Sequence, residues 1–414
     1  MNTFRIAGID VHKAMLAVVF TADSSGEGEI QFERPKFGAT PEQLRMLVDW
    51  LTQNRVQSAV MESTAQYWKP VWRALEGKCD LHLAQAQSNR APKGRKRDFA
   101  DAERLVRRFV ADELILSFVP DREQRLWRTL TRSKTQMTKQ KTEALNQMEA
   151  FLEEAGIKLS SLVSTLGGVS SRRILQALSE GETDLQKLAR LADPGLQASS
   201  AKLEDALSAA ATLDPDYRLL LGLFLQRLEA AEQQIEQLRR LIAQRMKAHR
   251  DAVVRLAEIP GVGVDSALQI IAEIGPEAAT FVAPEKLASW IGVCPGSHES
   301  AEVNRNSESP RGNRPMRRIL GLTANAAIKT KGSIFEQLYH RWVPRMGHNC
   351  ALWAVAHKMV RVIWTILHQH LRYLEKGYVA NPRAARQRAA RLLRQLKRLG
   401  YSVQIQPLAP SLSG

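Results

Sequence analysis

Four carboxylates in the first quarter of the chain have the types and spacing that metal-dependent chemistry needs. Asp10 closes the apolar run 6–9, and Glu62 closes the run 58–61. Asp98 and Asp101 are three residues apart, so on one helix they project from the same face. Oxygen donors of this kind suit hard cations such as Mg²⁺ or Mn²⁺, and two such ions can activate a nucleophile for phosphodiester cleavage. The group predicts a site in which Asp10, Glu62, Asp98 and Asp101 are catalytic and bind metal.

Each acid taken alone has a structural explanation. Asp10 could cap a turn, and Asp98 could begin a helix with Asp101 in its first turn. The four together, each at the end of an element, favour the metal site. A cationic loop at 89–97 precedes the last two acids and is suited to bind a phosphate beside them. Its predicted nucleic-acid-binding residues are Lys93, Arg95, Lys96 and Arg97.

The elements that must position these acids can be read from the periodicity. Strand patterns occupy 4–11, 15–21, 29–37, 57–62 and 80–86, and helical patterns occupy 41–54 and 67–75. Three early strands followed by strand-helix alternation predict a mixed α/β sheet, and acids at its strand ends are typical of a ribonuclease H-like fold. We assign residues 1–120 to this domain.

The middle of the chain, residues 121–252, is polar, Gln-rich and helical in period. Leu221, Leu228, Ile235 and Ile242 recur every seven residues, with Phe224, Ala231 and Leu238 at the companion positions. This spacing describes a coiled-coil seam, formed either within one chain as an antiparallel hairpin or between chains as a dimerisation arm. Residues 160–215 between the arms predict a small helical insert.

A second, mostly helical domain is predicted at 253–375. Its Gly261-Val262-Gly263 turn resembles a helix-hairpin-helix, in which backbone N–H groups approach a phosphate. A polar loop then carries several serines among arginines, and arginines are suited to bind phosphate. The nucleic-acid-binding residues predicted in this domain are Gly261, Gly263, Arg305, Arg311, Asn313, Arg314, Arg317 and Arg318. The tail 376–414 is basic and is either a solvated helix or a further phosphate contact.

Composition agrees with a polyanionic partner. The 414 residues include 59 Lys and Arg against 43 Asp and Glu, a formal net charge of +16. A membrane surface is the rival partner, but no run reaches the roughly 20 apolar residues of a span, and no leader-like segment opens the sequence. The three cysteines have no paired spacing and are expected to be ordinary buried thiols.

Five segments, in order, resemble the DEDD transposases of bacterial insertion sequences, family 110 with its group 1111. They cover about residues 4–110 and 253–370 and comprise Gly8-Ile9-Asp10-Val11-His12-Lys13, Met61-Glu62-Ser63-Thr64, the segment 94–103, the turn 259–263 and the segment 312–318.

The resemblance implies a RuvC-like domain whose metal ligands are the four acids. It further implies a serine nucleophile at Ser300, with Ser297 as the alternative, that forms a covalent link to DNA by phosphodiester transesterification. Such enzymes act on donor and target DNA as homo-oligomers, dimers or tetramers, guided by a bridge RNA. The expected setting is the bacterial cytoplasm, at the nucleoid, without a membrane.

Two other functions fit the same residues. The first is a junction resolvase or nuclease in which water is the nucleophile at the same acids. The second is an architectural nucleic-acid-binding protein whose acids are incidental. Replacement of Ser300 separates the first from a serine recombinase, and replacement of Asp10 or Asp101 tests the second.

Overall fold

The computed structural model describes residues 5–21, 32–62, 65–86, 88–89, 98–294, 299–300, 303–304, 312–375, 390 and 393–394. The chain divides into two compact units, Met1–Asp121 and Arg122–Gly414. In the described residues the first unit is an α/β domain. The second is helical apart from one short two-stranded hairpin.

The first unit is built on a six-stranded sheet in the order β3-β2-β1-β4-β5-β6. Its strands are β1 (Ile6–Val11), β2 (Met15–Thr21), β3 (Lys36–Gly38), β4 (Ser58–Glu62), β5 (Asp80–Ala84) and β6 (Leu116–Ser117). β1 and β2 are antiparallel, whereas β1, β4 and β5 run parallel. An antiparallel start followed by parallel strands is the order of the ribonuclease H-like fold, so the predicted fold class is confirmed.

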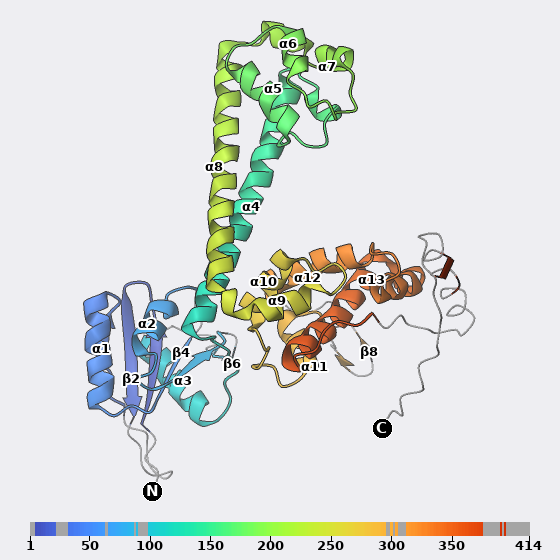
Figure 1. Cartoon of the computed structure of the whole chain (residues 1–414). Helices are drawn as coiled ribbons and strands as arrows, with labels where there is room; N and C mark the ends of the chain where they lie inside the picture. The colour runs from blue at the N-terminus through green and yellow to red at the C-terminus, as the bar shows by residue number, and fades with distance from the viewer. Residues whose placement is uncertain are drawn as a thin grey trace. The chain divides into compact units, whose positions relative to one another are not determined.

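Helices cover both faces of this sheet (Figure 1). α1 (Pro41–Gln53) and α2 (Trp68–Leu75) pack on the face that carries Ile9 and Met61, in one core with Leu47 and Leu75. α3 (Asp98–Val110) covers the opposite face, where its Leu105 joins a second cluster. Side chains that alternate along each strand therefore supply two different cores.

The third strand is shorter than the pattern at 29–37 predicts. It spans Lys36–Gly38, although Glu33 also forms an isolated bridge to Phe20. Pro35 lies between the two pairings and has no N–H to donate to the ladder, which interrupts the strand. Residues 22–31 lie outside the described part of the chain.

Two long helices of the second unit form an antiparallel hairpin, α4 (Arg122–Glu154) and α8 (Pro215–Arg245), which lie side by side in Figure 1. The predicted seam faces α4, since Leu221 and Leu228 are buried. Arg227 donates to Gln147 at 2.8 Å. In this single chain the seam packs against α4, and whether the arms also exchange between chains stays a prediction to be tested.

Short helices lie at the far end of this hairpin, within the range 155–214. They are α5 (Val169–Ser179), α6 (Leu185–Arg190) and α7 (Ser200–Ala206), with 3₁₀ turns at Leu159–Ser161 and Ser208–Thr212. Their apolar side chains share one core with the ends of α4 and α8.

The base of the hairpin packs on a helical core. After a 3₁₀ turn (Lys247–His249) come α9 (Arg250–Ala257), α10 (Val264–Ile274), α11 (Pro284–Ile291), α12 (Arg314–Ala327) and α13 (Ile334–His368). The hairpin of β7 (Glu299–Ser300) and β8 (Val303–Asn304) lies between α11 and α12 in the sequence.

α13 is the one helix of the described residues with the length and hydropathy of a membrane span. Gly347 breaks its backbone, with φ 76° and ψ 169°. Half of the apolar window is buried, and Val355, Met359 and Ile363 belong to the helical core. The apolar character of α13 is accounted for by this packing.

Candidate metal centre and nucleic-acid interface

Strand register brings the first two acids to one face of the sheet. Ile9 of β1 is aligned with Met61 of β4, so Asp10 and Glu62, the next residue on each strand, are neighbours. Because alternate side chains share a face, Glu62 lies on the side of Val60, which packs in a cluster with Leu105 of α3. Both acids therefore face the helix that carries the other two.

A close backbone approach fixes α3 over this face. A Cβ on Gly8 would lie 2.3 Å from the carbonyl oxygen of Ala102, so only glycine fits where β1 meets α3. α3 begins at Asp98, and Asp98 and Asp101 both lie in its first turn, as the spacing predicts. The first turn of a helix also favours negative side chains.

The electrostatics of Asp10 show that the four acids converge. Burial raises the pKa of Asp10, and the nearby Asp101, Glu62 and Asp98 carboxylates raise it further, whereas His12 lowers it. All three other acids are thus close enough to act on Asp10. The side chains of Asp10 and Asp101 are 16% and 17% exposed, and that of Asp98 is 45% exposed. The cluster is open to solvent on the Asp98 side.

His12 is a member of this cluster that the sequence analysis did not assign. Its Nε2 lies 3.1 Å from Asp10 Oδ2 and 3.3 Å from Asp98 Oδ1. The three side chains could share one metal ion. The spacing could have predicted this position, because His12 follows Asp10 by two residues and alternate residues of an extended chain share a face.

Asn89 and Arg104 connect the second acid to the fourth. The Asn89 amide nitrogen donates to Glu62 Oε2 at 2.9 Å, and Arg104 Nε donates to the Asn89 carbonyl at 3.1 Å. Arg104 is also paired with Asp101. Asn89 is 2% exposed, and among the described residues its Oδ1 accepts no hydrogen bond. These contacts orient Glu62 and Asp101.

The donor set fits a divalent cation. One ligand atom each from Asp10, His12 and Asp98 lies within 4.8 Å of the other two, whereas Glu62 and Asp101 are not in that group and contact Asn89 and Arg104. Like charges held this close repel each other, and a bound cation would relieve that repulsion. Hard oxygen donors favour Mg²⁺, Ca²⁺ or Mn²⁺ over zinc.

Several predicted residues lie outside the described part of the chain. They are Lys93, Arg95, Lys96, Arg97, Ser297, Arg305 and Arg311, together with most of the tail 376–414. Ser300 is described by its backbone only. It lies in β7 and pairs with Val303 of β8, where the sequence analysis expected a loop.

The glycine turn before α10 is present, with different surroundings for its two glycines. A Cβ on Gly261 would lie 2.3 Å from the Thr323 carbonyl oxygen of α12, so packing alone requires glycine there. Gly263 precedes α10 and has no described atom within 4 Å of such a Cβ. Of the two, Gly263 leaves room for a phosphate.

The residues predicted to bind nucleic acid at the start of α12 also have different surroundings. Asn313 caps the helix by accepting from the Met316 N–H at 2.8 Å. Arg317 bonds to the Gly292 carbonyl and lies 4.8 Å from the centre of the Trp353 ring. Arg314 and Arg318 are exposed. The last two are therefore better placed to meet a nucleic acid.

Comparisons with known protein families match most of the described elements. Residues 7–157 match the family DEDD_Tnp_IS110, described as a transposase. Residues 253–340 match the family described as Transposase IS116/IS110/IS902. The first match contains all four acids, and the second contains Gly261, Ser300 and the start of α12.

Two curated proteins are similar to this chain. A probable family 20 transposase of Pseudomonas aeruginosa is 24% identical over 319 residues, 75% of this chain and 83% of that protein. The insertion element IS900 uncharacterized 42 kDa protein of Mycobacterium paratuberculosis is 28% identical over 134 residues. That match covers 32% of this chain and only 33% of the IS900 protein.

Among solved structures, Thermus thermophilus RuvC matches 28% of this chain and 100% of its own, with a TM-score of 0.23 and 12% identity.

Proposed function

Since the chain belongs to the IS110 family of DEDD transposases, we propose that it cuts and rejoins DNA at a metal centre held by Asp10, Glu62, Asp98 and Asp101. The observation that carries this proposal is that Glu62 on β4 and Asp98 and Asp101 at the start of α3 all lie close to Asp10 on β1. Hard cations at such a site, Mg²⁺ or Mn²⁺, would polarise a DNA phosphate and lower the pKa of an attacking hydroxyl.

The protein's own side chains have distinct tasks at this centre. Asp10 and Glu62 on the sheet and Asp98 and Asp101 in the first turn of α3 would hold the ion. Asn89 and Arg104 hold Glu62 and Asp101 in place through their hydrogen bonds. His12 contacts Asp10 and Asp98 and could be a further ligand of the ion.

A covalent step completes the proposed mechanism, with Ser300 as nucleophile and Ser297 as the alternative. The serine oxygen forms a bond to phosphorus while a bridging oxygen of the DNA strand leaves and takes up a proton. The phosphoserine ester retains the energy of the broken bond, so a free strand end can reverse the attack and join a new partner. This chemistry needs no high-energy cofactor.

The proposed partners are donor DNA, target DNA and a bridge RNA, bound by a homo-oligomer. The net charge of +16 supports binding to such polyanions. Arg314, Arg318 and Gly263 are the described positions that fit phosphate contacts.

A strand-transfer assay tests the proposal. It uses the full chain, a plasmid carrying the element ends with their flanking noncoding DNA, and MgCl₂. Asp10→Asn and Asp101→Asn should abolish exchange but retain nucleic-acid binding, whereas an architectural protein would tolerate both changes. Ser300→Ala should abolish exchange and the protein–DNA adduct seen on denaturing gels, with Ser297→Ala as its matched variant. Cleavage without an adduct in either serine variant would instead favour water as nucleophile.

A further inference from the structure

A cavity in the second unit is lined by three arginines and shares no residue with the acid cluster. It has a volume of about 290 Å³ and lies between α4, α10 and α12. Arg132 comes from α4, and Arg314 and Arg318 come from α12. Because Arg314 and Arg318 are four residues apart on one helix, they share a face. Guanidinium groups gathered in this way are suited to bind a phosphate.

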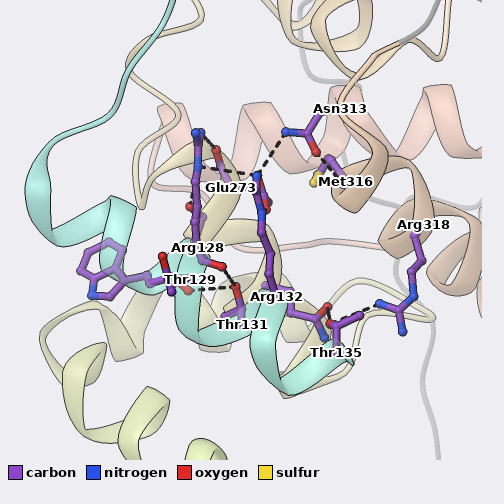
Figure 2. A network of polar contacts seen from close by, with 12 residues as sticks. Arg128, Thr129, Thr131, Arg132, Thr135, Glu273, Asn313, Met316 and Arg318 are labelled. Atoms are coloured by element: carbon purple, nitrogen blue, oxygen red, sulfur yellow. Dashed lines mark hydrogen bonds and ion pairs between the residues drawn. The ribbon is translucent and has the colours of Figure 1, made fainter. Parts of the chain in front are cut away.

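One buried carboxylate orients the first of these arginines. Figure 2 shows Arg128, Arg132 and Asn313 converging on Glu273, which is 1% exposed. Arg132 gives Glu273 a two-point contact, with Nε and Nη2 each 2.8 Å from a carboxylate oxygen. Its Nη1 takes no part in this contact. The fork is held rigidly, so a ligand would not need to order it.

The charge of the cavity lining favours an anion. Glu273 is the single acid of the lining, and its oxygens accept from Arg132 and, at 3.1 Å, from Asn313. Arg314 forms no hydrogen bond or ion pair with any residue in the described ranges. Arg318 makes one long contact, 3.4 Å to the Thr135 hydroxyl, visible in Figure 2. Two arginines therefore remain available beside the oriented one.

The remaining charges nearby are already paired with each other. Asp265, one turn before Gln269 on α10, is paired with Lys134 and accepts from the Gln269 amide at 2.9 Å. Gln269 also contacts the Thr135 hydroxyl at 3.3 Å. Within the described residues, the pairing of Asp265 with Lys134 and of Glu273 with Arg132 leaves the charges of Arg314 and Arg318 without an acidic partner.

We propose that this cavity binds one backbone phosphate of a nucleic-acid strand, clamped by Arg132, Arg314 and Arg318. The phosphate ties the base of the α4 arm to the start of α12, because its partners come from both helices. This inference rests on the proposed function, since it names where the nucleic acid is held. DNA and RNA share this phosphodiester chemistry.

Binding without metal tests the pocket independently of catalysis. Fluorescence anisotropy is measured with the full chain in EDTA, using labelled 30-nucleotide single strands of DNA and RNA of one sequence. Arg314→Gln and Arg318→Gln are compared with Arg173→Gln, which removes the same charge from an exposed position on α5. Melting curves verify that each variant is folded. Because the assay contains EDTA and measures binding alone, failure of the catalytic proposal would leave this result intact.

Each pocket variant should weaken binding about 3- to 10-fold and lower the salt slope by about 0.7, the share of one single-strand phosphate. Arg173→Gln should change the affinity and the salt slope by less than either pocket variant does. Weakening for DNA alone, for RNA alone or for both would support the pocket and identify the strand. Affinities and slopes for both strands that match those of Arg173→Gln would overturn the proposal.

Discussion

Gly8 of β1 and Ala102 of α3 approach so closely that a Cβ on the glycine would lie 2.3 Å from the alanine carbonyl oxygen. This contact sets the distance between the strand that ends at Asp10 and the helix that begins at Asp98. The geometry of the acid cluster therefore depends on a residue without a side chain.

Gly8→Ala should push α3 away from the sheet. The added methyl meets backbone, which cannot rotate aside as a side chain could, and we expect a loss of about 1–3 kcal/mol of unfolding free energy. Strand transfer should fall further than stability explains, because Asp98 and Asp101 move with the helix. Urea unfolding and the transfer assay measure the two effects. Gly222→Ala is the control, since its nearest described neighbour is 3.9 Å away; equal behaviour of both variants would contradict the close contact.

Asp10→Asn should lower strand transfer by about 100-fold or more, because a metal ligand is lost. In the absence of metal, the same substitution should increase the stability of the folded protein. The pKa of Asp10 is raised in the folded protein, chiefly by burial, so stability is lost as the pH rises through that pKa. At neutral pH in EDTA, the uncharged asparagine should therefore raise the melting temperature.

With MgCl₂ present, the parent should instead melt at a higher temperature than Asp10→Asn. A cation at 100 times its Kd stabilises the parent by about 2.7 kcal/mol, whereas Asp10→Asn should gain much less. Thermal melts with EDTA and with MgCl₂ provide the measurement, and Asp49→Asn on the exposed side of α1 is the matched control. If Asp10→Asn gained as much from MgCl₂ as the parent, Asp10 would not be a ligand.

Asn89→Ala should impair catalysis while leaving the fold nearly unchanged. The variant removes the amide that donates to Glu62 but keeps the backbone carbonyl that accepts from Arg104. Loss of such a supporting contact typically costs about 10- to 100-fold in activity or metal affinity. A titration of strand transfer against MgCl₂ should show a higher metal requirement. Ser88→Ala, the control at the neighbouring residue, should require no more MgCl₂ than the parent. If Asn89→Ala gave the same MgCl₂ titration as the parent, Asn89 would not position Glu62.

Glu273→Gln should destabilise the second unit. It removes the charge opposite Arg132 and Arg128 at a position that is 1% exposed. Breaking a fully buried pair costs about 3–5 kcal/mol, and because the Arg132 side chain is 44% exposed we expect about 1–3 kcal/mol. Denaturant unfolding checks this value. Glu277→Gln, on the exposed surface beyond α10, should fall within about 0.5 kcal/mol of the parent.

The sequence was sufficient to predict the strands that end at Asp10 and Glu62, because buried apolar runs and terminal acids are local signals. It was also sufficient for the first turn of α3, where spacing alone places Asp98 and Asp101 on one face. The bond from Asn89 to Glu62 joins residues 27 apart and exists only once β4 and the segment before α3 are packed together. No local pattern contains that information.

Glu273 carries a sequence signal of its own. It is a single acid between Ala272 and Ile274 in a helix whose neighbours are buried, and a buried acid requires partners. Its partners on α4 are about 140 residues earlier, so the need for a pair was visible but its identity was not. The heptad pattern of α8 was similarly incomplete, since it predicts a seam without naming the helix opposite.

The α4–α8 pairing can be tested by crosslinking. The side chains of Gln147 and Arg227 are hydrogen bonded at 2.8 Å across the hairpin, so in Gln147→Cys with Arg227→Cys the two thiols should be joined by a short bis-maleimide that spans the length of the two replaced side chains. If the seam is intramolecular, the product on a non-reducing denaturing gel is a monomer of altered mobility. Arms exchanged between chains would give a covalent dimer instead. Gln147→Cys with Glu229→Cys is the control, because residue 229 is two positions further along α8 and points away from α4.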